Sequence, residues 1–266
     1  MRWLESASVL QGQTFRNVVL IKLQMPDALW VDGRDLWQRR GRRVLRGQSG
    51  IRVMAAGHRS ERAQGPVQGH GVATLWDVSQ TGGREVGLPS VAAGNGISAQ
   101  RLFDALTRVA GDLGFTVTQQ QTTGEAMTDH RRRRIAISPD LDVPDASSAL
   151  AHELAHLRMH KFSRGQACTG IAELEADSVA YTVLAHFGRL GDGSPGQLVR
   201  AAPVLGSNPS ARLIETLGGR VVTAAGRLIS ATEQHLPSPS RTGRSPAQLV
   251  AASTDLTPVQ DRQPGF

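Results

Sequence analysis

The stretch that most constrains the fold is SALAHELAHLRMH, residues 148–160, which contains His152, Glu153 and His156 in the pattern H-E-x-x-H. In an α-helix, residues four apart lie about 40° apart around the axis, so the two imidazoles point at one spot. Such a pair can hold Zn²⁺ at roughly 2.0–2.1 Å. Glu153, about 100° further round, lies beside the metal and suits a general base that acts on an activated water. The pattern therefore predicts a zinc-binding helix that needs a third ligand from elsewhere.

The segment ELEAD, residues 173–177, offers that third ligand. On a helix Glu173 and Asp177 share a face, whereas Glu175 lies on nearly the opposite side. A carboxylate that faces the motif helix can bind the metal, and one a turn further can accept the N–H of a ligand imidazole. We expect Glu173 to be the ligand and Asp177 to support a ligand His. The alternatives are that Glu175 is the ligand and Glu173 is not, or that the cluster is an acidic, solvated face. If Glu175 is not a ligand, we expect it to face elsewhere, for example solvent.

Three further side chains near the motif have competing roles. His160 lies eight residues after His152, near the same helix face, and is expected to orient a substrate or cap the helix rather than bind metal. Cys168 is the single cysteine and Tyr181 the single tyrosine, and both are expected to pack in the core. A lone cysteine cannot form an intrachain disulfide, which favours a reducing, cytoplasmic compartment.

All the net positive charge lies in the first quarter of the chain. Residues 1–62 hold twelve Lys or Arg and five Asp or Glu, while the formal charge of the whole chain is +7. Guanidinium groups bind phosphates and exposed tryptophans stack on bases, so this stretch suits single-stranded nucleic acid. The alternative is that the tryptophans are core and the arginines a solvated rim. The expected contacts are Trp37, Arg39, Arg40, Arg42, Arg43 and Arg46, with Trp30 beside them.

The remaining pattern predicts an α+β chain in two domains. A small α+β domain is expected at 14–86, a mainly helical domain with a small sheet at 97–235, and a disordered, Pro-rich tail at 236–266. No apolar run is long enough to predict a membrane span. Strands are expected at 51–54, 72–77, 114–117 and 134–138, and helices at 14–24, at 98–112, over the motif from an Asp145 cap, and at 171–187, 197–205 and 210–234.

The order of motifs in the first domain resembles that of ArdC-like antirestriction proteins, whose N-terminal domain binds single-stranded DNA. With the second domain included, the resemblance covers roughly residues 14–190. Arg46 replaces a Lys of the family pattern and Thr14 a Ser. The matching positions are Thr14, Asn17, Gln24, Pro26, Trp37, Gly41, Arg42, Val44, Gly47, Gly50, Ile51, Asp77, Val78, Gln80 and Thr81.

The second domain resembles the zincin metallopeptidases of the ImmA/IrrE type. His152, Glu153, His156 and the segment 173–181 match, but the Tyr-Ser and Trp that many relatives carry further on are lacking within 191–204. The resemblance implies a protein of plasmids, phage or other mobile elements that binds single-stranded DNA and protects it from restriction. Two alternatives remain: a regulatory zinc protease that cleaves a repressor or restriction component, and a DNA-binding protein with a catalytically silent zincin fold.

Overall fold

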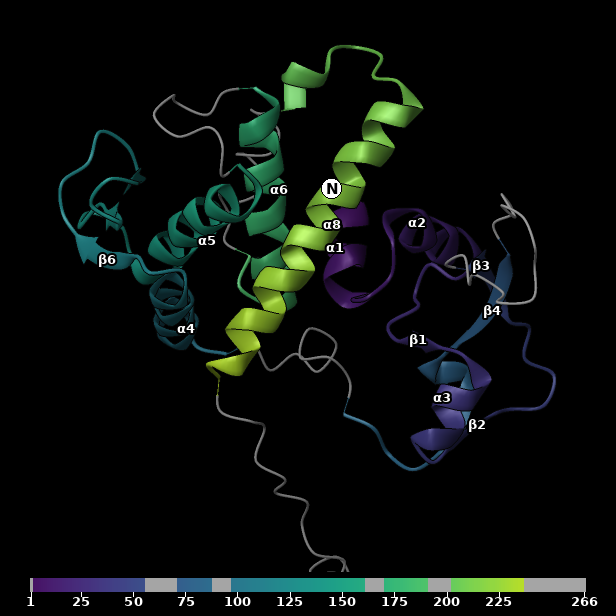
Figure 1. Ribbon diagram of the computed structural model, residues 1–266. Helices are drawn as coiled ribbons and strands as arrows, with labels where there is room; N and C mark the ends of the chain where they lie inside the picture. Colours follow the sequence, from purple (N-terminus) through teal and green to yellow (C-terminus); the bar gives the residue numbers. More distant parts are fainter. Residues whose placement is uncertain (1, 56–70, 88–96, 161–169, 191–201, 237–266) are drawn as a thin grey trace, which may run out of the picture. The chain divides into compact units, whose positions relative to one another are not determined.

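The computed structural model describes residues 2–55, 71–87, 97–160, 170–190 and 202–236 (Figure 1). Two hydrophobic cores lie within this part of the chain. The smaller includes Val18, Ile21 and Val53, and the larger is built mainly from residues after 100. Contacts between Cα atoms group Met1–Leu236 into a single unit. The domain boundaries at 14–86 and 97–235 stay a prediction.

The N-terminal half combines short helices with two small antiparallel sheets. Three strands pair in the order β1-β4-β3, and β2 pairs with β5. The expected strands at 51–54 and 72–77 are confirmed as β3 and β4, and the chain continues through η1 into β5. The elements are α2 (Phe15–Gln24), β1 (Val31–Asp32), α3 (Arg34–Arg39), β2 (Arg42–Val44), β3 (Ile51–Met54), β4 (Val72–Asp77), the 3-10 helix η1 (Val78–Gln80) and β5 (Thr81–Gly83).

Helix α2 begins after Thr14, as predicted, because the Thr14 hydroxyl accepts the Asn17 N–H at 3.3 Å. Its buried face includes a polar residue beside apolar ones. Asn17, Val18 and Ile21 are buried, whereas Leu23 is 77% exposed. The reason is that β3 packs along the side of α2 that carries Asn17, which a count of apolar residues does not reveal.

The first residues form helix α1 (Arg2–Val9). Leu4 belongs to the larger core, while Ala7 and Leu10 belong to the smaller one. The helix contacts α6, where the Tyr181 hydroxyl donates to Glu5 Oε1 at 2.8 Å. Tyr181 is therefore a buried structural residue, as predicted. The apolar pattern of α1 is too short to be recognised without the partner helices.

The C-terminal half is mainly helical, and its three-stranded sheet, of order β6-β8-β7, lies at one edge and packs against α4 and α5 (Figure 1). Strand β8 runs parallel to β6 and antiparallel to β7. The mixed α+β class with a helical C-terminal part is thereby confirmed. The elements are α4 (Ala99–Asp112), β6 (Thr116–Gln119), β7 (Ala126–Asp129), β8 (Arg134–Ile137), α5 (Val143–Met159), α6 (Ile171–His186), the 3-10 helix η2 (Ala202–Leu205) and α8 (Ala211–Gln234).

Three local predictions for this half need correction. The N-cap of α5 is Asp142 rather than Asp145, because Pro144 lies in the first turn and Asp142 Oδ1 accepts the Asp145 N–H at 2.9 Å. Strand β7 lacks a clear apolar pattern and was missed. Within the predicted helix at 197–205, residues 202–205 form the 3-10 helix η2.

Several expectations fall on undescribed residues. Cys168, the rest of the helix at 197–205 and the tail beyond Leu236 lie outside the part of the chain that the structure describes. Among the helices that are described, none has the length and apolar character needed to cross a bilayer.

Candidate metal centre and basic surface

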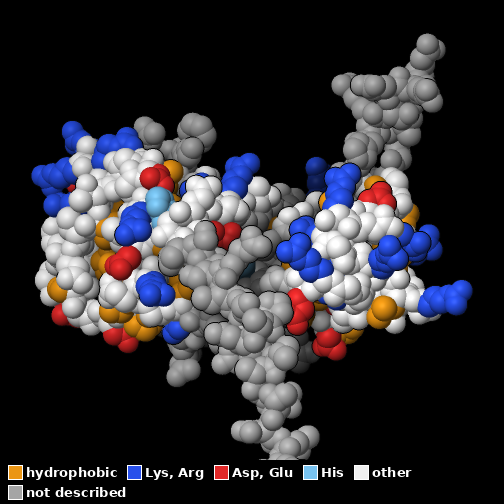
Figure 2. Space-filling model, turned by 90° about the horizontal axis from the view of Figure 1, so that it is seen from below, with side chains coloured by type: hydrophobic (Ala, Val, Ile, Leu, Met, Phe, Trp, Pro, Cys, Tyr) orange, Lys and Arg blue, Asp and Glu red, His pale blue; other side chains and the backbone are white. Residues whose placement is uncertain are grey.

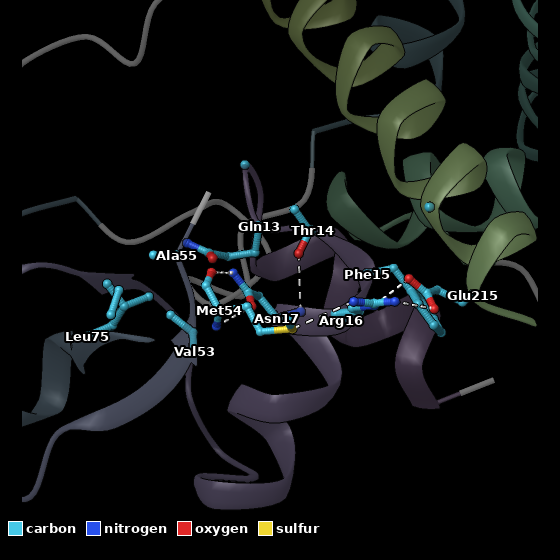
Figure 3. Close-up of a pocket in the computed structure, with 13 residues that line it drawn as sticks. Gln13, Thr14, Phe15, Arg16, Asn17, Val53, Met54, Ala55, Leu75 and Glu215 are labelled. Carbon is cyan, nitrogen blue, oxygen red and sulfur yellow. Dashed lines mark hydrogen bonds and ion pairs between the residues drawn. The ribbon is translucent and has the colours of Figure 1, made fainter. Parts of the chain in front are cut away.

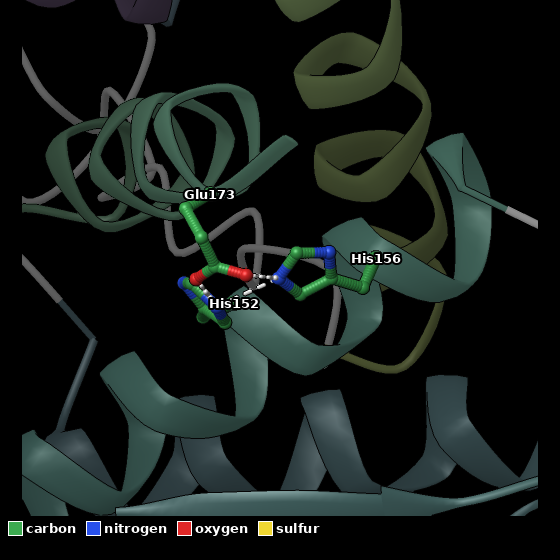
Figure 4. A group of neighbouring side chains, drawn as sticks. All are labelled: His152, His156 and Glu173. Carbon is green, nitrogen blue, oxygen red and sulfur yellow. Dashed lines mark hydrogen bonds and ion pairs between the residues drawn. The ribbon is translucent and has the colours of Figure 1, made fainter. Parts of the chain in front are cut away.

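Helices α5 and α6 bring His152, His156 and Glu173 together, as the sequence predicts (Figure 4). The Nε2 atoms of His152 and His156 are 2.8 Å apart. The Glu173 carboxylate lies 3.4 Å from His152 Nε2 through Oε2 and 3.3 Å from His156 Nε2 through Oε1. One ligand atom from each residue lies within 4.8 Å of the other two. The two imidazoles and the carboxylate therefore converge on one point, and this donor set fits a divalent metal of the zinc type.

Two carboxylates around this cluster have distinct partners. Asp177 Oδ1 lies 2.8 Å from His152 Nδ1, on the side of the ring that faces away from Glu173. An Nδ1–H that donates to Asp177 fixes the tautomer in which His152 Nε2 is the free donor atom for a metal. Glu153 Oε2 accepts the Thr128 hydroxyl at 2.5 Å. Strand β7, absent from the sequence prediction, thus holds the expected general base in place.

The electrostatics of the cluster favour a protonated His152 in the metal-free protein. Burial lowers the pKa of His152, but hydrogen bonds to Asp177 and Glu173 outweigh it and raise the pKa to about 10. Hydrogen bonds from His152 and His156 hold the pKa of Glu173 at about 2, against the opposing effect of burial. At neutral pH His152 is therefore cationic beside an ionised Glu173, and a metal must displace that proton to bind.

Glu175 does not face solvent, contrary to expectation, but is 2% exposed. Its Oε2 lies 3.0 Å from His160 Nε2 and 3.0 Å from Arg220 Nη2 on α8. His160 Nδ1 in turn lies 3.0 Å from His156 Nδ1. With His156 Nε2 as a metal ligand, its Nδ1–H donates to His160, whose Nε2–H donates to Glu175. The spacing of residues suggested that His160 orients a substrate or caps the helix, and the contact with His156 could not be read from it.

Two of the residues predicted to contact nucleic acid have partners within the protein. Trp37 is fully buried, and its indole N–H donates to the Trp76 carbonyl at 2.8 Å, so the ring cannot stack on a base. Arg42 donates through Nε to Thr81 Oγ1 at 2.7 Å and through Nη2 to the Thr81 carbonyl at 2.8 Å. Its guanidinium ties β2 to β5 and is a structural group.

The other predicted arginines stand at the surface. The guanidinium groups of Arg39, Arg43 and Arg46 are exposed and have no hydrogen-bond or ion-pair partner among the described residues. Arg40 lies 4.7 Å above the Trp30 ring and also pairs with Asp32 at 3.1 Å. Figure 2 shows Lys and Arg side chains, in blue, clustered over the region of α3 and β2.

A second Arg–Trp pair adds to this surface and was not foreseen. Arg34 lies 5.0 Å above the Trp76 ring. Trp76 is on the face of the β1-β4-β3 sheet that also carries Thr74 and Arg52, opposite the buried Ile51 and Val53. A side chain at Gly50 would overlap Thr74 and Trp76, which explains a glycine there. We define the basic surface as Arg34, Arg39, Arg40, Arg43, Arg46, Arg52, Trp30 and Trp76.

Other residues of the N-terminal motifs have structural tasks. Asn17 Nδ2 donates to the Met54 carbonyl and Asn17 Oδ1 accepts the Met54 N–H, both at 3.0 Å (Figure 3). Gln24 does the same for Arg52, at 2.8 and 2.9 Å. These amides saturate the edge of β3 that β4 does not pair. Asp77 Oδ2 accepts the backbone N–H groups of Leu29 and Trp30 at 2.7 and 2.9 Å.

Comparison with known proteins agrees with this arrangement. Residues 110–184 match the family model of the IrrE N-terminal-like domain (Peptidase_M78). The metal-free crystal structure of the antirestriction protein ArdC from plasmid R388 is similar, with a TM-score of 0.50, 15% identity, and coverage of 88% of this chain and 90% of ArdC. The Mn(II)-bound structure of ArdC gives a TM-score of 0.48 at 15% identity, covering 88% and 96%.

A search of curated proteins gave no match. The segment that matches the family model includes α5 and most of α6, and so contains His152, Glu153, His156 and Glu173. The chain carries an IrrE N-terminal-like (Peptidase_M78) domain and shares its fold with the antirestriction protein ArdC.

Proposed function

We propose that this protein is an ArdC-like antirestriction protein that binds single-stranded DNA and holds zinc at His152, His156 and Glu173. The observation that carries the proposal is the convergence of these three side chains in a chain that also presents a basic surface with tryptophans. The fold shared with ArdC supports it.

The donor set selects the class of metal. Two imidazole nitrogens and one carboxylate form the three-ligand set that hydrolytic zinc sites use. When bound, zinc polarises a carbonyl group and makes water more acidic. Asp177 keeps the Nε2 lone pair of His152 available, and His160 does so for His156.

The chain also offers a base and a guide for a peptide. Glu153 lies next to His152 in sequence, and its carboxylate, fixed by Thr128, can take a proton from water beside the two His.

Strand β7 has an edge that can pair with a peptide. The Ser138 N–H donates to the Glu125 carbonyl, so alternation along the antiparallel ladder leaves the N–H and C=O of Ala126 and Thr128 pointing away from β8. An extended peptide can therefore add to β7. Strand β8 cannot take this role, because it is central and paired on both sides.

The basic surface supports the DNA-binding part of the proposal. Arg39, Arg43 and Arg46 are available to contact phosphates, because the described part of the chain gives them no counter-charge. The Trp30 and Trp76 rings, each with an arginine over it, offer planar surfaces next to these charges. Unpaired bases can stack there, which double-stranded DNA does not permit.

A regulatory zinc protease that cleaves a repressor or a restriction component is the second candidate. This candidate is favoured by the hydrogen bond from Thr128 to Glu153 and by the position of β7 at the edge of the described sheet. A purely structural metal site needs neither feature. Glu153→Gln separates the two, since it keeps the shape and removes the base. Antirestriction that persists in Glu153→Gln would contradict the protease; its loss, with metal and DNA binding intact, would contradict the proposal of protection by binding alone.

Metal analysis by mass spectrometry tests the metal part. Purified wild-type protein is expected to hold one zinc per chain, and Glu173→Ala to lose it. Glu175→Gln is the matched control, since Glu175 lies on nearly the opposite side of the helix from Glu173 and contacts His160 instead. Zinc lost in Glu175→Gln but kept in Glu173→Ala would reverse the assignment of the ligand.

Fluorescence anisotropy with a labelled oligo-dT tests the DNA part. Arg43→Ala with Arg46→Ala is expected to weaken binding and flatten its salt dependence by about 0.7 per lost phosphate contact. Arg101→Ala with Arg212→Ala removes the same charge from exposed positions of the C-terminal half. Equal weakening by both pairs would mean that net charge, rather than the basic surface, is responsible.

A further inference from the structure

A second group of arginines lines a pocket that shares no residue with the metal cluster or the basic surface. An open pocket of about 530 Å³ is bounded by the ends of α4 and α5 and by the middle of α8. Arg158, Arg220 and Arg227 line it, and Glu215 is its one acidic lining residue. None of the ligands predicted for the metal and none of the arginines of the basic surface belongs to it.

The positive charge of this pocket is only partly balanced. Glu215 is engaged by Arg16, whose Nη2 donates to Oε2 at 2.7 Å, and Arg220 is paired with Glu175 (Figure 3 shows the Arg16–Glu215 contact). Arg227 has no hydrogen-bond or ion-pair partner among the described residues. The Nε atom of Arg158 is buried and likewise lacks a hydrogen-bond partner.

The environment of Arg158 points the same way. Arg158 is half-buried and Arg227 is exposed, and both side chains line this one pocket. Two guanidinium groups that repel each other at one hollow are stabilised when an anion lies between them.

We propose that the pocket lined by Arg158, Arg220 and Arg227 binds a phosphate group, carried by a nucleotide or by the nucleic-acid backbone. Planar guanidinium groups match the oxygens of phosphate and can each donate two hydrogen bonds. The contact with Glu175 holds Arg220 in place, so one of the three donors is oriented in advance. Gly219 on the same wall leaves room, because a Cβ added there would meet no atom within 4 Å.

Arg220 is unsuited as a test because it also supports His160 through Glu175. Arg227 is exposed and Arg158 is half-buried, and neither forms a hydrogen bond or ion pair with another described residue, so Arg227→Ala and Arg158→Gln are expected to fold. Arg101→Ala removes one exposed arginine elsewhere and serves as the matched control.

The experiment is isothermal titration calorimetry of the full-length, zinc-loaded protein with inorganic phosphate. Wild type and Arg101→Ala are expected to bind one phosphate alike, and Arg227→Ala and Arg158→Gln to bind it about tenfold more weakly or worse. Failure of wild type to bind, or affinities in Arg227→Ala and Arg158→Gln that equal that of Arg101→Ala, would overturn the proposal.

Competition identifies the source of the phosphate. In the Arg43→Ala, Arg46→Ala background, which weakens the basic surface, dTMP and a ten-residue oligo-dT are added to the phosphate-bound protein. Displacement by dTMP alone indicates a nucleotide site. Displacement by oligo-dT that is lost with Arg227→Ala indicates that the pocket follows the DNA backbone. Displacement that survives Arg227→Ala would contradict binding at this pocket.

Discussion

The motif residues of the N-terminal half and those of the metal centre are used in opposite ways. Asn17, Gln24 and Asp77 bind the protein's own backbone. His152, His156 and Glu173 instead turn their polar atoms toward one another. In the first region the motif residues stabilise the fold and so form a structural platform, and the proposed DNA-binding groups are the arginines around it. In the second, the conspicuous residues are themselves the site.

The difference shows that a motif of polar residues indicates that these side chains bind something, but does not indicate whether the partner is the protein's own backbone or a metal ion. A backbone amide that lacks a sheet partner requires a polar side chain at a fixed place, and a metal ion has the same requirement. Trp37 illustrates the risk, because its position among arginines suggested base stacking while its indole N–H serves the Trp76 carbonyl.

The pH dependence of metal affinity has the largest expected effect. His152 has a pKa of about 10 in the metal-free protein, so below that pH zinc must displace its proton. Affinity is expected to rise about tenfold per pH unit from pH 6.5 toward 10 and to level off above the pKa. Titration with a competing chelator measures it, and calorimetry in two buffers detects the released proton. A flat affinity over this range would show that His152 is not a ligand.

Removal of Trp37 is expected to cost the N-terminal half about 3–5 kcal/mol in the free energy of unfolding, because a fully buried indole is lost. Trp30→Ala is the matched change at a half-buried ring and is expected to cost less. Chemical denaturation followed by circular dichroism measures both. If Trp37→Ala leaves stability unchanged and weakens DNA binding, the division between platform and binding groups is wrong.

Asn17→Leu is expected to lower the free energy of unfolding by about 1–3 kcal/mol, because the Met54 N–H and C=O lose their partners at the edge of β3. Gln24→Leu repeats the change at an exposed position, where water can replace the amide, and should cost less. Urea denaturation of the two variants provides the comparison. Equal costs would mean that burial at this edge is unimportant.

His160→Ala is expected to weaken zinc binding about 10- to 100-fold without changing the stoichiometry, because the His156 ring loses the partner of its Nδ1–H. His160→Gln can still accept that hydrogen and should restore part of the affinity. The visible spectrum of the cobalt-substituted protein reports whether the ligand geometry changes. An unchanged affinity and spectrum in His160→Ala would show that the contact has no role in positioning His156.

Much of the metal centre could be predicted because helical periodicity is a local rule. The spacing of His152 and His156, and of Glu173 and Asp177, places each pair on one face whatever surrounds it. The partners of Glu175 could not be predicted, because His160 lies at the end of α5 and Arg220 lies on α8, both far from Glu175 in the sequence. Strand β7 was missed for the same reason, since it is held by pairing with β8 rather than by its own pattern.

Residue order alone is enough to predict the α+β class, the helix that carries the two His, the face shared by Glu173 and Asp177, and the concentration of arginines near the N-terminus. Each of these follows from residue order over one or two turns or from a simple count. Tertiary structure alone decided that Trp37 and Arg42 are structural, that Thr128 holds Glu153, and that three arginines meet at α8. Those outcomes depend on burial and on contacts between segments far apart in the chain, which local periodicity does not encode.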